Sequence, residues 1–276
     1  MKKVLLPFDG THFSEGAIKF ACSLNRLQPL LLTGLFVPQV TYANLWSFSE
    51  AGKLPEDIPL LDERNERELD WNIARFEALC ASCHMTYIVH KEVFDFALPE
   101  LERESRFADL LLIGSERFYQ LLDQEDGVND YLQVALHSAE CPVLVVPEQV
   151  HFPQQILLAY DGSKSSVYAI RQFAYLFPEL ADRETVLIYL DPKSREKKVP
   201  EEKNIRELAS VHFKRLTVME LDTHPGREFG RWLAQNPHAL LVCGSYGRSM
   251  LSEFVHDSFV KEVIREHRLP VFIAHR

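Results

Sequence analysis

KVLLPFDGT, residues 3–11, recurs 152 residues further along the chain as QILLAYDGS, residues 155–163. Each copy is a short apolar run that ends in Asp-Gly followed by a hydroxyl residue. A Ser-x2-Ala-Ile pattern then follows at the same offset, at residues 14–18 and 166–170. Patterns that keep their spacing over such a distance indicate an internal repeat, so the chain is one structural unit written twice.

Two further anchors repeat in the same order. A leucine-rich run that ends in Gly-Ser occupies Ala108–Ser115 and again Pro237–Ser245. A short apolar segment with Pro at its second position closes each copy, at Cys141–Val146 and at Leu269–Ala274. Three anchors in one order make a chance resemblance between the halves implausible.

The chain of 276 residues is long enough for two domains, each with its own core. We expect one domain at residues 1–148 and another at 154–276, with a linker at Pro147–Pro153. Within each half, short apolar runs alternate with amphipathic segments, which is typical of parallel strands joined by helices. The expected fold class is therefore α/β, with two tandem doubly wound domains. Each would be a five-stranded parallel sheet with helices on both faces.

The expected boundaries are clearest in the second half, because the first carries an irregular insertion near Gln39–Asp62. The expected strands are Gln155–Tyr160, Thr185–Leu190, Leu216–Leu221, Ala239–Cys243 and Pro270–Ala274. The expected helices are Ser163–Phe177, Pro200–Phe213, Pro225–Gln235 and Met250–His267.

The net charge of −10 is unevenly distributed. Residues 1–150 hold 12 Lys and Arg against 24 Asp and Glu, whereas the remainder holds 18 against 16. Neither half has a basic stripe, so we expect no nucleic-acid partner. No run of eighteen apolar residues occurs, so we expect no membrane span. The first ten residues lack the apolar core of a signal peptide, and we expect a cytoplasmic protein.

The five cysteines are odd in number and scattered, so we expect no disulfide framework. Cys80 and Cys83, followed by His84, match the spacing of a haem-attachment motif. They also lie at the end of a helical pattern, where residues three apart share a face. We therefore expect both cysteines to pack in the core, with a redox or metal role as the alternative.

Residues typical of a ligand site follow the first and fourth strands of each half. Asp9 and Asp161 end the first strands, where an Asp can cap the next helix or contact a ligand, and we expect a cap at Asp9. Gly244 and Gly247 follow the fourth strand of the second half, where they allow a tight turn whose amides form an anion-binding nest. A parallel sheet also needs tight turns, so an architectural role for these glycines stays open.

These motifs resemble the universal stress protein family of the UspA type, and the resemblance covers nearly all of both halves. Members that bind ATP carry Gly-x2-Gly-x9-Gly-Ser/Thr after the fourth strand and an Asp at the end of the first. The resemblance implies an adenine nucleotide alpha hydrolase-like fold. It also implies ATP or another adenine nucleotide as ligand of the second half, with Mg²⁺ as a candidate ion. The implied binding residues are Ala159, Tyr160, Asp161, Cys243, Gly244, Gly247, Arg248, Ser258 and Phe259.

Two departures from this pattern affect the expected affinity. Asp257 stands at the third glycine position of the second half and adds a carboxylate where phosphates would bind. That like charge weakens binding by about 1 kcal/mol when partly screened. In the first half, Arg117 stands at the second glycine position, and four acidic residues follow, at positions 123, 125, 126 and 130. We expect this loop to be solvated and to bind no anion.

The sequence contains no Walker loop, no Gly-x-Ser-x-Gly elbow and no paired Cys/His nucleophile, so a binding module is favoured over an enzyme. Three hypotheses follow: a stress-response module whose second domain binds an adenine nucleotide, a nucleotide-free scaffold for an unknown protein partner, and a slow ATPase. The resemblance further implies that the terminal strands, Pro142–Val146 and Pro270–Ala274, pair within the chain as a pseudo-dimer. A further homodimer stays open.

Overall fold

The computed structural model describes residues 1–38, 63–92, 97–116, 130–189, 199–220, 236, 238–244, 263–264, 266 and 269–274. The strands of the first half are β1 Lys2–Phe8, β2 Leu30–Phe36, β3 Thr86–Lys91, β4 Leu110–Gly114 and β5 Val143–Val146. Those of the second half are β6 Gln155–Tyr160, β7 Glu184–Tyr189, β8 Arg215–Glu220, β9 Ala239–Cys243 and β10 Val271–Ile273. The helices are α1 Glu15–Leu27, α3 Glu63–Ser82, α4 Ala97–Ser105, α5 Asp130–Ser138, α6 Lys164–Leu176, α7 Pro178–Ala181 and α8 Glu202–His212.

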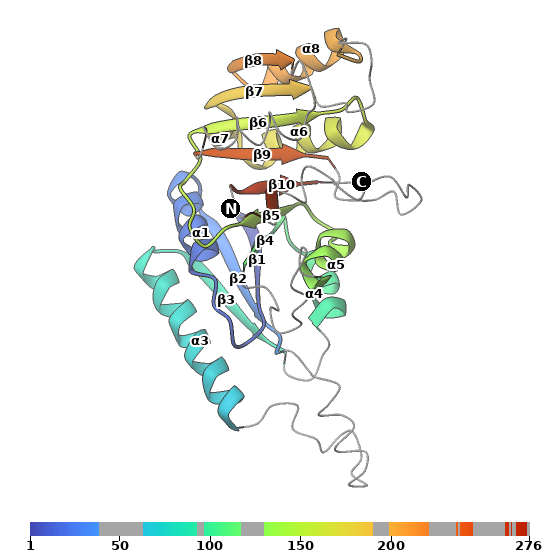
Figure 1. The fold of residues 1–276 in the computed structure, drawn as a ribbon. Helices are drawn as coiled ribbons and strands as arrows, with labels where there is room; N and C mark the ends of the chain where they lie inside the picture. The colour runs from blue at the N-terminus through green and yellow to red at the C-terminus, as the bar shows by residue number, and fades with distance from the viewer. Residues whose placement is uncertain are drawn as a thin grey trace.

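The strands form one continuous ten-stranded sheet in the order β3-β2-β1-β4-β5-β10-β9-β6-β7-β8 (Figure 1). Neighbouring strands within each half are parallel. Where the halves meet, β10 pairs antiparallel with β5, and Phe272 lies opposite Leu144. The expected pairing of the two terminal strands is confirmed, and it removes two sheet edges that would otherwise lie open.

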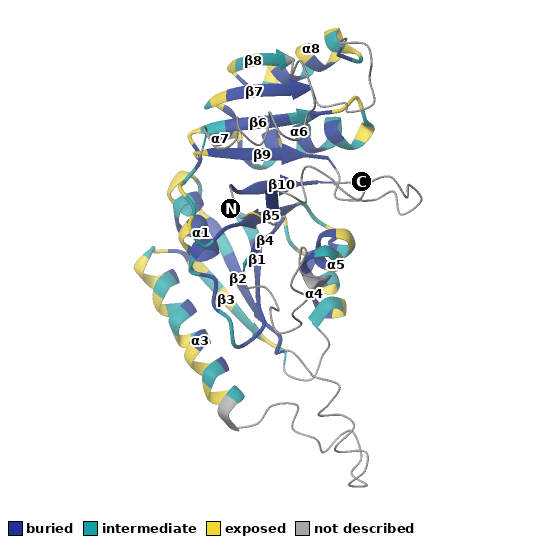
Figure 2. Cartoon of the chain, viewed as in Figure 1, coloured by how far each residue is buried: buried dark blue, intermediate teal, exposed yellow. Residues whose placement is uncertain are grey.

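Helices cover both faces of the sheet, so the α/β class with parallel strands is confirmed. Along β1, Val4, Leu6 and Phe8 face one core, which also contains residues of α1, α3, α6 and α8. Leu5 faces the other core, which contains residues of α4 and α5. Figure 2 shows the consequence: the central strands are buried, whereas the helices expose their outer surfaces.

The strand positions follow from the apolar runs. In the second half, β6 and β9 have the expected bounds, and β7 and β8 begin and end one residue early. The helix expected at Pro225–Gln235 lies outside the described residues, and so does most of the one expected at Met250–His267. The insertion at Gln39–Asp62 is outside them too. In the described part of the chain, no helix has the length and apolarity to span a bilayer.

The two copies start their first helices at different places in the repeat. Ser163 caps α6 by accepting a hydrogen bond from the backbone amide of Ser166. In the first half the cap is Ser14, whose hydroxyl accepts from the amide of Ala17. The expected cap at Asp9 was wrong, because its carboxylate is engaged in the turn before the helix.

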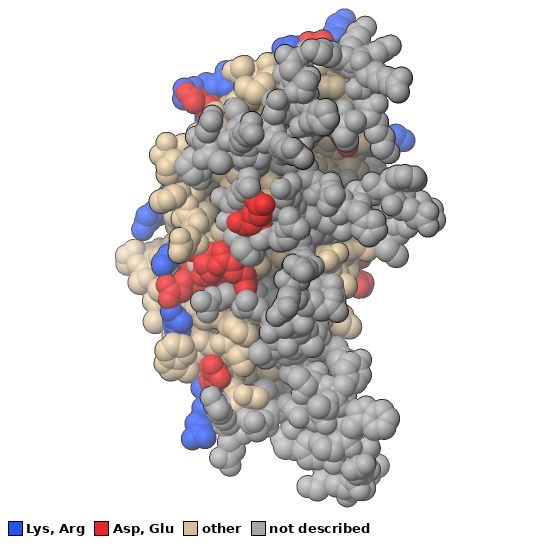
Figure 3. All heavy atoms as spheres, in the orientation of Figure 1, with Lys and Arg blue, Asp and Glu red and all other residues tan. Residues whose placement is uncertain are grey.

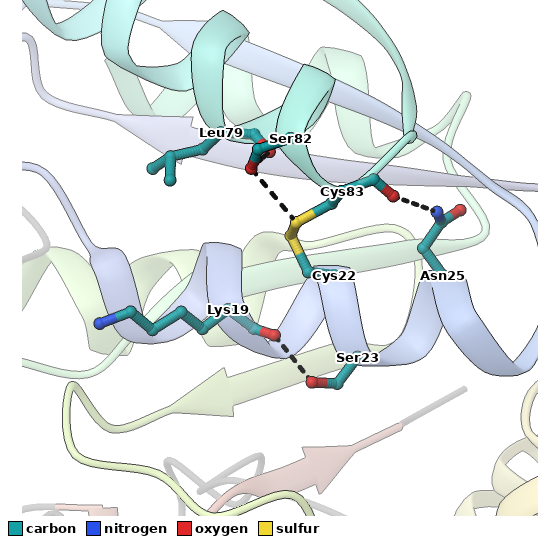
Figure 4. The surroundings of a disulfide bond; sticks show 7 residues. All are labelled: Lys19, Cys22, Ser23, Asn25, Leu79, Ser82 and Cys83. Atoms are coloured by element: carbon teal, nitrogen blue, oxygen red, sulfur yellow. Dashed lines mark hydrogen bonds between the residues drawn. A yellow bond between two sulfur atoms is a disulfide. The ribbon is translucent and has the colours of Figure 1, made fainter.

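The expectation that Cys83 only packs in the core was also wrong, because it forms a disulfide. Cys22, on α1, is bonded to Cys83 in the turn after α3, and their Cα atoms lie 5.7 Å apart (Figure 4). The side-chain Nδ2 of Asn25 on α1 donates to the backbone carbonyl of Cys83, so a second contact holds the same turn. The two cysteines are 61 residues apart, and only the packing of α1 on α3 brings them together. Cys80 is buried and free, as expected of a packing residue.

We predict that the Cys22→Ser/Cys83→Ser variant unfolds more easily than the wild type. Opening a loop of this length gives the unfolded chain more conformational freedom, which lowers the free energy of unfolding by about 2–4 kcal/mol. Guanidinium titration under oxidising conditions measures the difference. Cys141→Ser, which changes a free cysteine, is the control. Equal midpoints for the double variant and the wild type would show that the disulfide does not stabilise the fold.

Candidate functional site

The carboxyl ends of β6 and β9 lie side by side at the point where the strand order of the second half reverses. Leu158 of β6 is in register with Val242 of β9, while β7 pairs with β6 on its other side. Ligands of doubly wound sheets bind at this kind of switch point. The structure thus places the predicted residues of the two strand ends together. These are Ala159, Tyr160 and Asp161 after β6, and Cys243 and Gly244 after β9. The other four, Gly247, Arg248, Ser258 and Phe259, lie outside the described residues.

Gly244 lies directly against the first turn of α6. A Cβ atom added there would stand 2.1 Å from the carbonyl carbon of Ser165, far inside van der Waals contact. At the corresponding position of the first half, a Cβ on Gly114 would stand 2.3 Å from the Ser14 hydroxyl. Both glycines therefore let the helix approach the strand end. This architectural role holds whether or not a ligand binds.

Asp161 is exposed at the tip of the turn between β6 and α6. Its carboxylate accepts one hydrogen bond within the described structure, from the amide of Ser163 at 2.9 Å. Gly162 completes the turn with a φ of +81°, a left-handed conformation that favours glycine. Burial, with a contribution from the Asp161 charge, raises the pKa of the Cys243 thiol, so that thiol stays protonated at neutral pH.

Asp9, the counterpart of Asp161, is in a different environment. It is 3% exposed, and both of its oxygens are engaged. Oδ1 accepts from the amides of Thr11 and His12, at 2.9 and 2.7 Å. Oδ2 lies 2.7 Å from Nδ1 of His12. The carboxylate of Asp9 is thus fully hydrogen-bonded within its own turn, whereas that of Asp161 is exposed to solvent.

Tyr160 is buried at the end of β6. Its hydroxyl donates to the carbonyl of Pro200 at 2.9 Å, which ties the end of β6 to the segment before α8. Burial raises the pKa of this phenol, and the charges of Glu201 and Asp161 raise it further, so the hydroxyl remains a donor at neutral pH. Ala159 is half-buried beside it.

A cleft of about 700 Å³ opens next to this strand end, between α6 and α8. Tyr160, Gly162 and Ser163 form its end wall, but Asp161, Cys243 and Gly244 do not line it. This cleft was not predicted from the sequence. Its signal is a loss of bulk within the repeat, because Ser165 stands where the first half has Phe13.

Metal binding has no support from clustered ligands in the part of the chain that the structure describes. No group of three or more His, Cys, Asp and Glu side chains gathers there.

The surface charge is uneven. On the face shown in Figure 3, carboxylates form a patch over the first half, with Lys and Arg mostly at the rim. The second half is the less repulsive one for an anion.

These features define a class: a tandem doubly wound α/β protein whose halves share one sheet. No protein-family model matches the chain. It is 25% identical to universal stress protein Slr1230 of Synechocystis sp. (strain ATCC 27184 / PCC 6803 / Kazusa), with 98% of this chain and 99% of that protein aligned.

Two solved structures share the fold along the whole chain. A universal stress protein from Archaeoglobus fulgidus DSM 4304 superposes with a TM-score of 0.69 at 17% identity, covering 100% of this chain and 96% of that one. A protein of unknown function from Pseudomonas aeruginosa PAO1 reaches a TM-score of 0.56 at 14% identity, covering 100% and 92%. The chain is therefore similar over its whole length to a universal stress protein, and it shares the fold of these two structures along its whole length.

We predict that Gly244→Ala destabilises the protein more than Gly114→Ala. The new methyl group at 244 meets the backbone of two residues of α6, Ser165 and Ser166, whereas at 114 it meets only the hydroxyl and Cβ of Ser14, so a smaller shift relieves that contact. Overpacking of this kind costs about 1–3 kcal/mol. Thermal melts of the two variants without added ligand show which one has the lower melting temperature. The reverse order would contradict the tight approach of α6 to β9.

Proposed function

We propose that the protein is a stress-response signalling module whose second half binds an adenine nucleotide at the carboxyl ends of β6 and β9. The observation that carries the proposal is the difference between the two strand-end aspartates. Asp9 is buried and its oxygens are engaged, while Asp161 is exposed with a single described hydrogen bond. A carboxylate in this position accepts hydrogen bonds from the ribose hydroxyls of a nucleotide.

The resemblance assigns the remaining roles. Ala159 and Tyr160 offer backbone and ring atoms to the base, and Cys243 and Gly244 border the phosphates. Gly247, Arg248, Ser258 and Phe259 complete the loop in this proposal. Asp257 lowers the affinity for a triphosphate more than that for a monophosphate, because its charge acts on the phosphates. Asp161 would be the residue to hold a Mg²⁺ ion, whose positive charge would offset part of that repulsion.

A nucleotide-free scaffold is the second candidate. The continuous sheet favours it, because the pairing of β5 with β10 joins the halves without any ligand. Slow ATP hydrolysis is the third. It would require Asp161 to orient a water molecule, and turnover that Asp161→Ala abolishes would support it.

We predict that Asp161→Ala weakens AMP and ATP binding about tenfold or more. The loss corresponds to one charge-assisted hydrogen bond to ribose. Isothermal titration calorimetry measures it, and Asp182→Ala, which removes an exposed carboxylate of the same half paired with Lys214, is the control. Unchanged affinity in Asp161→Ala would rule out this site, and no binding by the wild type would favour the scaffold.

We further predict that Gly247→Glu abolishes nucleotide binding, since it adds bulk and a second negative charge to the loop assigned to the phosphates. Calorimetry with AMP and adenosine separates the two effects. Loss of AMP binding with adenosine binding retained would place the phosphates at this loop. Equal affinities of variant and wild type for AMP would contradict the assignment.

A further inference from the structure

The groove between the first two helices is closed in the first half by side chains of that half. The ring of Phe13 stacks on Phe8, with centroids 5.2 Å apart. The guanidinium of Arg75, from α3, lies 4.4 Å above the Phe13 ring and pairs with Glu15 of α1. Trp71 contacts the same guanidinium at 5.3 Å. An aromatic ring, a cation and a carboxylate thus fill this groove.

The second half lacks each of these side chains. The repeat places Ser165 at the position of Phe13, and Val167 at that of Glu15. Aligning α3 and α8 on their buried pairs, Phe76/Cys80 and Ile205/Ala209, places Asn204 at the position of Arg75. The ring, the carboxylate and the guanidinium are therefore replaced by smaller, uncharged groups. The cleft of about 700 Å³ lies in the space they leave.

The walls of this cleft have a defined chemistry. Val167, Tyr168, Ile205 and Leu208 supply apolar surface, of which only Ile205 is fully buried. The volume falls within the range of small-molecule sites, about 300–1,000 Å³. An aromatic ring fits this lining, as the Phe13 ring fits the corresponding groove of the first half.

The α6 wall also carries two cations on one face. Lys164, Tyr168 and Arg171 are spaced by four and three residues, so they project from the same side of the helix. Arg171 lies over the Tyr168 ring at 5.8 Å. Within the described residues, neither Lys164 nor Arg171 has a carboxylate partner. The acidic residue of the lining, Glu201, accepts a hydrogen bond from Asn204 on the opposite wall.

We propose that the cleft between α6 and α8 is a second ligand site, for a small aromatic anion, which adjoins the strand-end site at Tyr160. The ring of the ligand takes the place that Phe13 fills in the first half, between the apolar faces of the two helices. Its carboxylate, sulfonate or phosphate group lies along α6, between Lys164 and Arg171. Asp161 and Gly244 take no part, because they do not line the cleft.

Two dyes that share a ring system test both parts of this proposal, the apolar lining and the two cations. The fluorescence of 1-anilinonaphthalene-8-sulfonate rises when it enters an apolar site, and N-phenyl-1-naphthylamine has the same rings without the charge. We predict that Ser165→Phe, which restores the ring of the first half, weakens both dyes at least tenfold. Arg171→Gln and Lys164→Gln should each weaken the sulfonate about threefold to tenfold and leave the neutral dye unchanged.

The controls separate this site from general hydrophobic binding and from the nucleotide site. Ser210→Phe adds the same ring to the exposed side of α8 and should change neither affinity. Val167→Glu copies Glu15 at a half-exposed position that needs no room in the core. It should weaken the sulfonate only. Asp161→Ala should leave both dyes unaffected even if it abolishes nucleotide binding.

The dye measurements can overturn the proposed site or identify the class of its ligand. Sulfonate affinity that is unchanged in both Ser165→Phe and Val167→Glu overturns the proposal, as does equal weakening of the two dyes by Arg171→Gln. Displacement of the sulfonate dye by indole-3-acetate but not by AMP identifies the ligand as an aromatic carboxylate. Displacement by AMP in the Asp161→Ala variant identifies it as an aromatic phosphate. Displacement by neither, at millimolar concentration, overturns the site as one for small aromatic anions.

Discussion

The antiparallel pairing of β5 with β10 is the contact on which the whole architecture depends. Each half builds a parallel sheet whose last strand would otherwise be an open edge, and this pairing joins the two edges into one ten-stranded sheet. The packing follows the pairing. Phe272 of β10 contacts Phe173 and Phe177, and Phe152 of the linker packs on Phe20 of α1. Because one core runs through the junction, the two halves support each other without a ligand.

Within that shared sheet, the two copies differ in where their first helix begins. In the repeat register α1 begins three residues later than α6, so Phe13 belongs to an irregular stretch, whereas Ser165 lies in the first turn of a helix. The irregular stretch lets Phe13 reach the Phe8 ring and lets the amide of His12 bond to Asp9. Helix α6 uses the same positions for its own first turn, which leaves Asp161 exposed and the neighbouring cleft open. A small local difference thus closes one copy and opens the other.

The fold was readable from the sequence because its signals are local and repeated. Apolar runs define strands, and the repeat shows that the same order occurs twice, so the β6 and β9 bounds were predicted to the residue. Predictions that depended on tertiary contacts fared worse. The Cys22–Cys83 bond joins residues from separate elements, and Asp9 looked like a cap because the turn that engages it has no sequence signature of its own. The cleft was missed for a similar reason: the repeat shows Ser165 in place of Phe13, but the space this leaves depends on α8, where Asn204 stands in place of Arg75.

The contacts that stabilise the first half are the same ones that leave it no room for a ligand. Its four-ring aromatic cluster around Phe8 and its engaged Asp9 rigidify the region beside the end of β1, and its disulfide ties α1 to the turn after α3. Sites that bind ligands commonly give up such contacts, because an unfilled groove and an unpaired charge both cost stability. In the second half, Ser165 and Asn204 border an open cleft in place of those contacts. Since the β5–β10 pairing fixes the two halves in one sheet and one core runs through their junction, the closed copy supports the open one.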